Sequence, residues 1–258
     1  MVMSAIPNLM TSSHTVASFF RKLVSVIFFV SLWEFLSYIK LNQFLLFINI
    51  PSPFQVLARL VQELSSFAIY EDMGHTLLRV FLGVIIASFV GVSLGIASGL
   101  NTHFDDFLFP ISELLRPIPN IAWAPLVVVL FPVVEHSIIF ITFIGAFFPI
   151  LINTKFGVRS IPKKYFNTAK TLGFTFYDRL FQLVFPAALP MILTGIRIGM
   201  GVSWLGVIVA EMISGRNGIG YYTWLGYQLV DFTQIITGIV CIGVLSLGSS
   251  LLVTLIES

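Results

Sequence analysis

The feature that most constrains this chain is a series of long apolar runs. Crossing the hydrocarbon core of a membrane takes roughly 20 mostly apolar residues, and we count six runs of about that length. Five lie at about Leu23–Ile39, Leu77–Leu100, Ser137–Asn153, Ala188–Ala210 and Ile235–Ile256, and the third in chain order begins near Phe107 or near Ile121. Only 10% of the residues are charged, against about 25% in soluble domains. We therefore predict an all-α integral membrane protein with six transmembrane helices.

The third run is irregular because prolines interrupt it at positions 110, 117, 119, 125 and 132. It either begins near Phe107 and is broken by Pro117 and Pro119, or begins near Ile121. Broken helix at membrane depth is tolerated only where protein or a cavity covers it. This region is therefore a candidate wall for a solute pathway.

Two other segments are distinguished by their periodicity. Phe54–Phe67 is amphipathic and too charged to cross, so we expect it at the membrane surface. In the second run, small residues recur every fourth position, at Gly83, Ala87, Gly91, Gly95 and Gly99. Such a stripe allows another helix to approach closely. We favour static packing there over a moving interface.

Charge predicts the orientation. Six of the fourteen Lys and Arg residues lie between Lys155 and Pro186, which assigns this loop to the cytoplasm. Counting back places the N-terminus inside, as Arg21 and Lys22 before the first run also indicate, and the C-terminus inside as well. No small-residue cleavage site follows the first run, so we predict an uncleaved span and not a signal peptide. The expected division is a cytoplasmic segment over residues 1–22 and a transmembrane domain over 23–258, with a cytoplasmic loop at about 155–186.

A motif stands inside this basic loop. Residues 167–173 read NTAKTLG and, nine residues later, 183–186 read LVFP. The segment can form a short helix over Tyr165–Leu172, a turn at Gly173 and a second helix over Tyr177–Phe185. Such a projection suits a groove on a soluble partner; the alternative is an ordinary basic loop with no partner.

The spacing resembles the signature of importer permeases in the ATP-binding cassette (ABC) superfamily, which reads Glu-Ala-Ala, three residues, Gly, nine residues, Ile-x-Leu-Pro. Asn167 replaces the Glu and is uncharged, so it cannot supply the carboxylate of an ion pair there. In the family this element is the coupling helix that transmits ATPase closure to the spans. The resemblance assigns coupling to Asn167, Thr168, Ala169, Leu172, Gly173, Leu183 and Pro186.

Residues 30–245 as a whole resemble the nitrate/sulfonate/bicarbonate/taurine branch of these permeases. The matching blocks include LWE at 32–34, PSP at 51–53, TLLRVFLG at 76–83, LRPIPNIAWAPL at 115–126 and FFPILINT at 147–154. The resemblance implies a type I ABC importer permease fold in the cell inner (plasma) membrane. The expected partners are a second permease copy, two cassette ATPases and an extracytoplasmic solute-binding protein. The implied mechanism is alternating access.

The chain lacks a Gly-x4-Gly-Lys-Ser/Thr phosphate loop. We therefore expect a transport subunit and no enzyme, with no cofactor of its own, because ATP and Mg would be bound by the partner ATPase. A self-contained secondary transporter or channel is the alternative, but it needs paired ionisable residues deep in several spans, and beyond Glu34 they are scarce. An intramembrane protease would need Gly-x-Ser-Gly or His-Glu-x-x-His, and neither motif is present.

Polar residues near membrane depth are functional candidates because they are costly there. The candidate pathway residues are Arg116, Asn120, Trp123, Asn153, Thr194, Arg197, Ser203 and Glu211, with Trp204 as a further possibility. Arg197 faces either headgroups or the pathway, and Glu211 is a gate or docking residue or a cap for the Gly-rich loop after it. Glu34 is expected to pair with a basic group of another span. The four histidines lie outside the apolar runs, so no metal site is expected. The expected solute is a small oxyanion such as a sulfonate or taurine, nitrate or bicarbonate, with an organic sulfonate as first choice.

Overall fold

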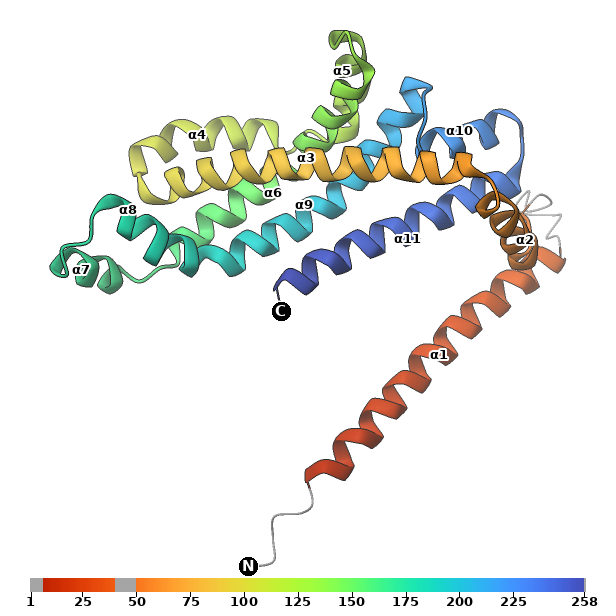
Figure 1. Ribbon diagram of the computed structural model, residues 1–258, viewed down its shortest axis with the longest axis horizontal. Helices are drawn as coiled ribbons and strands as arrows, with labels where there is room; N and C mark the ends of the chain where they lie inside the picture. The colour runs from red at the N-terminus through yellow and green to blue at the C-terminus, as the bar shows by residue number, and fades with distance from the viewer. Residues whose placement is uncertain (1–6, 40–49, 258) are drawn as a thin grey trace, which may run out of the picture.

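The computed structural model describes residues 7–39 and 50–257, and in that part of the chain every regular element is a helix (Figure 1). The elements are α1 (Pro7–Ile39), α2 (Pro53–Leu64), α3 (Phe67–Leu100), α4 (Thr102–Leu115), the 3₁₀ turn η2 (Asn120–Trp123), α5 (Ala124–Leu130), α6 (Val134–Arg159), α7 (Lys163–Thr171), α8 (Phe176–Asp178), the π-helical turn η3 (Arg179–Val184), α9 (Phe185–Ser214), α10 (Ile219–Gln228) and α11 (Phe232–Glu257).

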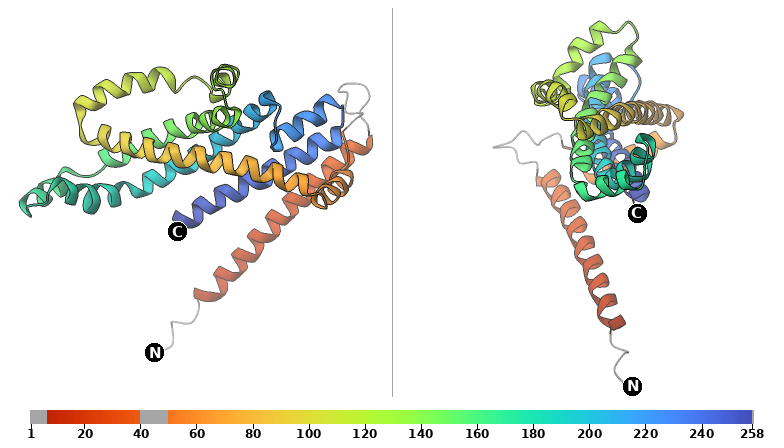
Figure 2. Two further views of the ribbon diagram at one scale, coloured as in Figure 1. Left: turned by 45° about the horizontal axis from the view of Figure 1, so that its top comes forward. Right: turned by 90° about the vertical axis from the view of Figure 1, so that its left-hand side faces the viewer.

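Four of the described helices are long and apolar enough to cross a membrane: Phe67–Leu100, Val134–Arg159, Phe176–Ser214 and Phe232–Leu255. A fifth span is possible if α4 and the η2–α5 segment, bent by 82° at a short break, count as one. The predicted all-α membrane fold is confirmed at this level. The first predicted run lies in α1, which starts at Pro7 and extends away from the other helices (Figures 1 and 2). The predicted boundary after residue 22 therefore falls inside a continuous helix, and residues 1–6 of that segment lie outside the described residues.

α2 covers most of the predicted amphipathic segment but begins one residue earlier and ends three residues earlier, and Ser52 and Gln55 build a capping box at its start. The next helix, α3, begins at Phe67, ten residues before the expected start of the second run. Its first turns carry several polar side chains, and these form hydrogen bonds with distant segments. Asp72, for example, accepts a hydrogen bond from the backbone N–H of Gly218 at 2.7 Å. The prediction placed the start too late because the apolar pattern begins only after these turns.

The small-residue stripe of α3 packs against α6, as predicted for a close helix approach. A Cβ atom added at Gly95 would lie 2.7 Å from the Cβ of Thr154, and one added at Gly99 would lie 2.6 Å from the Cβ of Val158. α6 packs against α9 on another side, and buried side chains from all three helices, such as Val84, Ile141 and Val207, form the main core. α6 is therefore the central helix of the bundle.

The Pro-rich region contains helix on both sides of Pro117 and Pro119, so where the third predicted span begins stays a prediction. α4 begins at Thr102, where Asn101 caps it, and ends at Leu115 before Pro117 and Pro119. Neither proline can donate a backbone hydrogen bond, so the chain leaves the helix and turns through η2 into α5.

The basic loop is shorter than predicted. Lys155 and Arg159 belong to the last turns of α6, and α7 then occupies Lys163–Thr171. Gly173 makes the predicted turn with φ +76°. The expected separate second helix is wrong, because α8 and η3 continue without a break into α9. The π-helical turn ends at Val184, two residues before Pro186, which lacks the N–H that an α-helical register would use there.

A helix that the sequence did not predict follows the Gly-rich loop. Gly215 ends α9 with φ +65°, Gly218 adopts φ +133°, and α10 then begins at Ile219. The last predicted run lies within α11.

Candidate functional site

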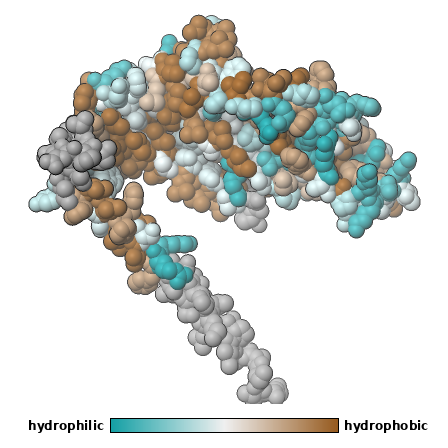
Figure 3. All heavy atoms as spheres, turned by 180° about the vertical axis from the view of Figure 1, so that it is seen from behind, coloured by the Kyte–Doolittle hydropathy of each residue, from teal (hydrophilic) through white to brown (hydrophobic). Residues whose placement is uncertain are grey.

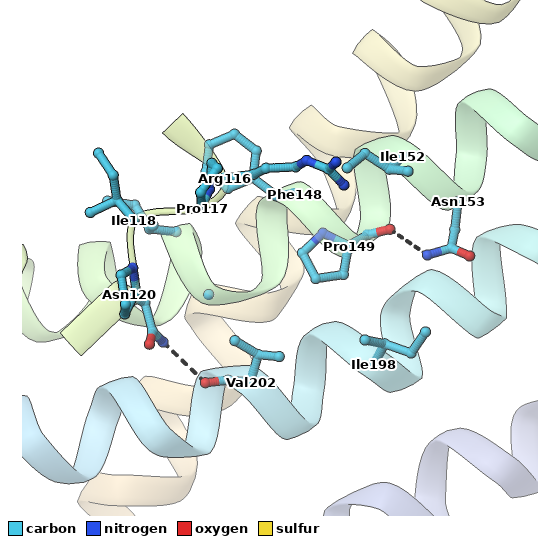
Figure 4. Close-up of a pocket in the computed structure, with 13 residues that line it drawn as sticks. Arg116, Pro117, Ile118, Asn120, Phe148, Pro149, Ile152, Asn153, Ile198 and Val202 are labelled. Atoms are coloured by element: carbon cyan, nitrogen blue, oxygen red, sulfur yellow. Dashed lines mark hydrogen bonds between the residues drawn. The ribbon is translucent and has the colours of Figure 1, made fainter. Parts of the chain in front are cut away.

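A cavity of about 640 Å³ lies where the α4–η2 break meets α6 and α9 (Figure 4). Pro117 and Pro119 hold the break open, and Asn120 fixes it to α9 by donating its side-chain amide to the carbonyl oxygen of Val202 at 3.1 Å. Glycine on both neighbouring helices makes room for this amide. A Cβ at Gly145 would lie 2.8 Å from Asn120 Nδ2, and one at Gly206 would lie 2.6 Å from it.

The cavity wall is mostly apolar and carries few polar groups. Asn153 donates its amide to the carbonyl of Pro149 at 2.8 Å, which leaves its side-chain oxygen as an acceptor (Figure 4). Arg116 is the charged member of the lining. Its guanidinium donates to Glu113 at 2.8 Å, and its side chain is 46% exposed. The charge of Arg116 on a mostly apolar wall suits a small polar anion.

The structure therefore brings three predicted pathway residues together, and it places the others elsewhere. Ser203 is fully buried and donates to the carbonyl of Thr142, while Thr194 donates to the carbonyl of Pro190. Trp123 packs against the main core. Arg197 is half-buried next to Ile198 of the cavity wall. Trp204, the further possibility, is buried and donates to Ser249.

Glu211 is fully buried and belongs to a cluster that we call the arginine cluster, made of Thr76, Arg79, Glu135 and Glu211. The guanidinium of Arg79 pairs with Glu211 at 2.7 Å and with Glu135 at 2.5 Å, and it also donates to the carbonyl of Asn217. Glu211 accepts the backbone N–H of Gly220 at 2.9 Å. Of the predicted alternatives for Glu211, the cap of the Gly-rich loop agrees with this geometry. Gly218 is needed beside it, because an added Cβ would overlap the carboxylate.

A second cluster, the aspartate cluster, consists of Ser98, Asp105, Lys155 and Arg159. Lys155 Nζ and Arg159 Nη2 each lie 2.6 Å from an oxygen of Asp105, and Ser98 donates to the same carboxylate. Lys155 also sits 3.8 Å above the ring of Phe109. Sequence reasoning missed both clusters. The available signals were Arg79 inside an apolar run and Lys155 directly after one.

Comparison with known proteins shows the family of this chain. A sequence model of binding-protein-dependent transport system inner membrane components matches residues 83–258. The chain belongs to this family. It is 36% identical to the nitrate import permease protein NrtB of Synechocystis over 221 residues, which cover 81% of this chain and 80% of that protein. It is 43% identical to the bicarbonate transport system permease protein CmpB of Synechococcus elongatus over 173 residues, covering 67% and 62%. It is 31% identical to the putative aliphatic sulfonates transport permease protein SsuC of Bacillus subtilis over 208 residues, covering 81% and 75%.

The resemblance to ABC importer permeases of the nitrate/sulfonate/bicarbonate branch is thus confirmed. The chain is a multi-pass permease component of an importer and not an enzyme.

The permease's motif segment lies at one end of the molecule, where α7 projects (Figures 1 and 2). Asn167 and Thr168 are exposed on α7, and Leu172 at its end is 67% exposed. Ala169 is buried beneath them, Leu183 is half-buried in η3, and Pro186 is exposed. A short helix presenting an apolar tip is able to dock on another protein, and its coupling role stays a prediction.

Two remaining expectations concern Glu34 and metals. Glu34 lies beside Tyr38 and Pro53, and within the described residues it makes no ion pair with a basic group of another span. Over the same part of the chain, no group of three or more His, Cys, Asp or Glu is arranged to hold a metal ion.

Proposed function

We propose that this permease moves a small oxyanion (a sulfonate or taurine, nitrate or bicarbonate) along the wall formed by Arg116, Asn120 and Asn153. The observation that carries the proposal is the placement of one arginine and two amides on an otherwise apolar cavity at the helix break. Arginine binds planar oxyanions through paired donors. The names of the relatives, which include nitrate, bicarbonate and aliphatic sulfonates, support this class of solute.

The proposed assembly contains a second permease copy, two cassette ATPases and an extracytoplasmic solute-binding protein. α1 would be the first of six spans, and both termini would lie in the cytoplasm with α7. A second copy would complete the pathway around the cavity. ATP binding would close the ATPases and turn the cavity outward, and opening after hydrolysis would return it inward.

The connection between α7 and the cavity supports a coupling role for the segment. The helix from Phe176 to Ser214 is continuous, and its far portion carries Ile198 and Val202 of the cavity wall. A short turn around Gly173 joins α7 to this helix, and α7 also packs against η3. A displacement of α7 would therefore be passed to the helix and to the part of the wall that it carries.

Uptake of labelled taurine, nitrate and bicarbonate into proteoliposomes containing the complete importer tests the pathway. We expect ATP-dependent uptake of one of them. Uptake should be at least about tenfold slower with Arg116→Gln, because this variant loses one charged hydrogen bond to the solute, which contributes ~1.5 kcal/mol or more. Arg21→Gln removes the same charge far from the cavity and should transport normally. Uptake without ATP would favour a secondary transporter, and normal uptake by Arg116→Gln would exclude this cavity as the route.

Co-purification followed by mass spectrometry tests the coupling segment. Leu172→Asp places a charge on the apolar tip and should abolish recovery of the ATPase. Leu229→Asp alters a similarly exposed leucine beside α10 at the opposite end of the molecule and should retain it. Equal ATPase recovery with both variants would exclude α7 as the docking element.

A further inference from the structure

A second cavity, of about 560 Å³, lies at the coupling end between the end of α3, the end of α6, α7 and η3. Arg159, Lys163 and Arg179 line it, and among the described residues in its wall none is acidic. One nitrogen of Arg159 pairs with Asp105, while its side chain remains 41% exposed. The cavity is therefore a cationic hollow beside the motif segment.

Apart from the pair between Arg159 and Asp105, no ion pair within the described residues compensates the positive charge of Lys163 and Arg179. Asp178 is the one acidic residue between positions 155 and 186, and its carboxylate accepts hydrogen bonds from Thr175 and Gln182. Asn167, which also lines the cavity, replaces the glutamate of the importer signature and adds no charge. In the described chain no side chain caps α7, whose first turn lines the cavity, so its positive end adds to the field.

An apolar groove of about 700 Å³ runs from this cavity along the outside of the bundle, between α3 and α9. The two hollows share three lining residues, Leu100, Phe176 and Leu180. Along the groove, Phe89 is 78% exposed and Phe181 is 64% exposed. Figure 3 shows more hydrophilic surface toward the α7 end of the bundle and more hydrophobic surface toward the opposite half. The cationic cavity and the apolar groove thus meet near the boundary between the apolar surface of the bundle and the hydrophilic α7 end.

We propose that the cationic cavity and the α3–α9 groove form one binding site for an anionic phospholipid. Lys163 and Arg179 hold the phosphate and headgroup, and an acyl chain lies in the groove. A free oxyanion would satisfy the charges but leave the groove unfilled, whereas a phospholipid satisfies both. Basic pockets between helices on the cytoplasmic side are known binding environments for such headgroups. The bound lipid joins α3, α7 and α9, so the position of the motif segment depends on the lipid composition of its leaflet.

Native mass spectrometry of the permease, purified with the subunits that assemble with it, tests the site. The detergent-solubilised complex is titrated with phosphatidylglycerol and, separately, with phosphatidylcholine of the same chain length. We expect selective retention of phosphatidylglycerol. Lys163→Gln and Arg179→Gln should each weaken it about fivefold, the ratio for ~1 kcal/mol per basic residue.

Two further variants separate the headgroup from the chain. Lys164→Gln removes the same charge one position along α7, outside the cavity lining, and should retain the lipid. Ser93→Trp fills the groove far from the cationic cavity and should reduce retention without changing any charge. This variant keeps the test valid if the charge variants fold poorly, and size-exclusion chromatography checks folding of each.

Three results would overturn the proposal. Equal retention of the two lipids would remove the anionic selectivity. Undiminished retention by the Lys163→Gln/Arg179→Gln double variant would place the lipid elsewhere. Displacement of the lipid by millimolar inorganic phosphate, with Ser93→Trp behaving as wild type, would make the cavity a small-anion site. None of these readouts requires import, so they are independent of the proposed transport function.

Discussion

The arginine cluster and the aspartate cluster lie at opposite ends of α6 and are built in opposite ways. Glu135 and Lys155 are twenty residues apart in this helix, which corresponds to roughly 30 Å, the thickness of the hydrocarbon core. The separation of the two clusters along α6 therefore matches the thickness of the hydrocarbon core of a membrane. One is centred on a cation, Arg79, and the other on a carboxylate, Asp105.

The two clusters differ in burial and in what they connect. Arg79 is 1% exposed and Glu211 0%, and together they join α3, α9 and the start of α10. In the aspartate cluster the side chains of Lys155 and Asp105 are slightly more exposed, at 8% and 9%, and Arg159 is 41% exposed. These pairs connect α4 to the last turns of α6. A charge pair shielded from water is costly to disrupt, whereas a partly hydrated one rearranges more easily. The arginine cluster, whose central pair is the more deeply buried, therefore marks the more fixed end of the molecule, and the aspartate cluster marks the more adaptable end, which carries the motif segment.

The largest effect is expected at the fixed end. Glu211→Ala leaves the buried Arg79 without its fully buried partner and should lower stability by about 3–5 kcal/mol. Glu135→Ala removes a partner that is 43% exposed, and because water can replace part of that interaction the loss should be about 1 kcal/mol. Thermal unfolding of the detergent-purified permease measures both. Equal losses would mean that the arginine cluster is open to water.

An intermediate effect is expected along the seam between the clusters. Gly95→Ala introduces a Cβ 2.7 Å from Thr154 Cβ and 2.8 Å from the Leu151 carbonyl oxygen, and such overpacking typically costs about 1–3 kcal/mol. Gly74→Ala lies in the same helix with no atom within 4 Å of the new Cβ, and it should stabilise α3 by up to about 1 kcal/mol. The same unfolding assay compares them. A neutral Gly95→Ala would show that α3 and α6 separate readily.

The smallest effects are expected at the adaptable end. The side chain of Lys155 is 8% exposed, and Lys155→Met removes it as a partner of Asp105. Arg159 and Ser98 remain in contact with the carboxylate, so we expect stability to fall by about 1–2 kcal/mol. Arg159→Gln should cost no more than about 1 kcal/mol because that side chain is well hydrated. Losses as large as that of Glu211→Ala would contradict the difference between the two ends.

Local patterns explain which parts of this architecture were predictable. Apolar run length predicted the membrane helices, and the four-residue repeat of small residues predicted the close packing of α3. Gly173 predicted the turn after α7. Each of these follows from neighbouring residues alone. The start of α3 and the fusion of η3 with α9 were missed because contacts with distant segments and a π-helical register override the local pattern.

The candidate site was predictable only in part. Arg116 and Asn120 were found because they flank the prolines that break the third run, and Asn153 joins them across the cavity. Ser203 has a similar local setting, yet it is turned into the core toward Thr142. Which face of a helix meets its neighbours depends on the arrangement of the bundle.

By itself, the sequence determined a membrane permease with its signature segment, because span length, small-residue spacing and motif order are properties of consecutive residues. Only the tertiary structure decided that Arg79 meets Glu211, 132 positions away, and that Asp105 meets Lys155. A buried charge requires a partner, but the chain does not show which one. That choice is made when α6 packs between α3 and α9 and brings these side chains within hydrogen-bonding distance.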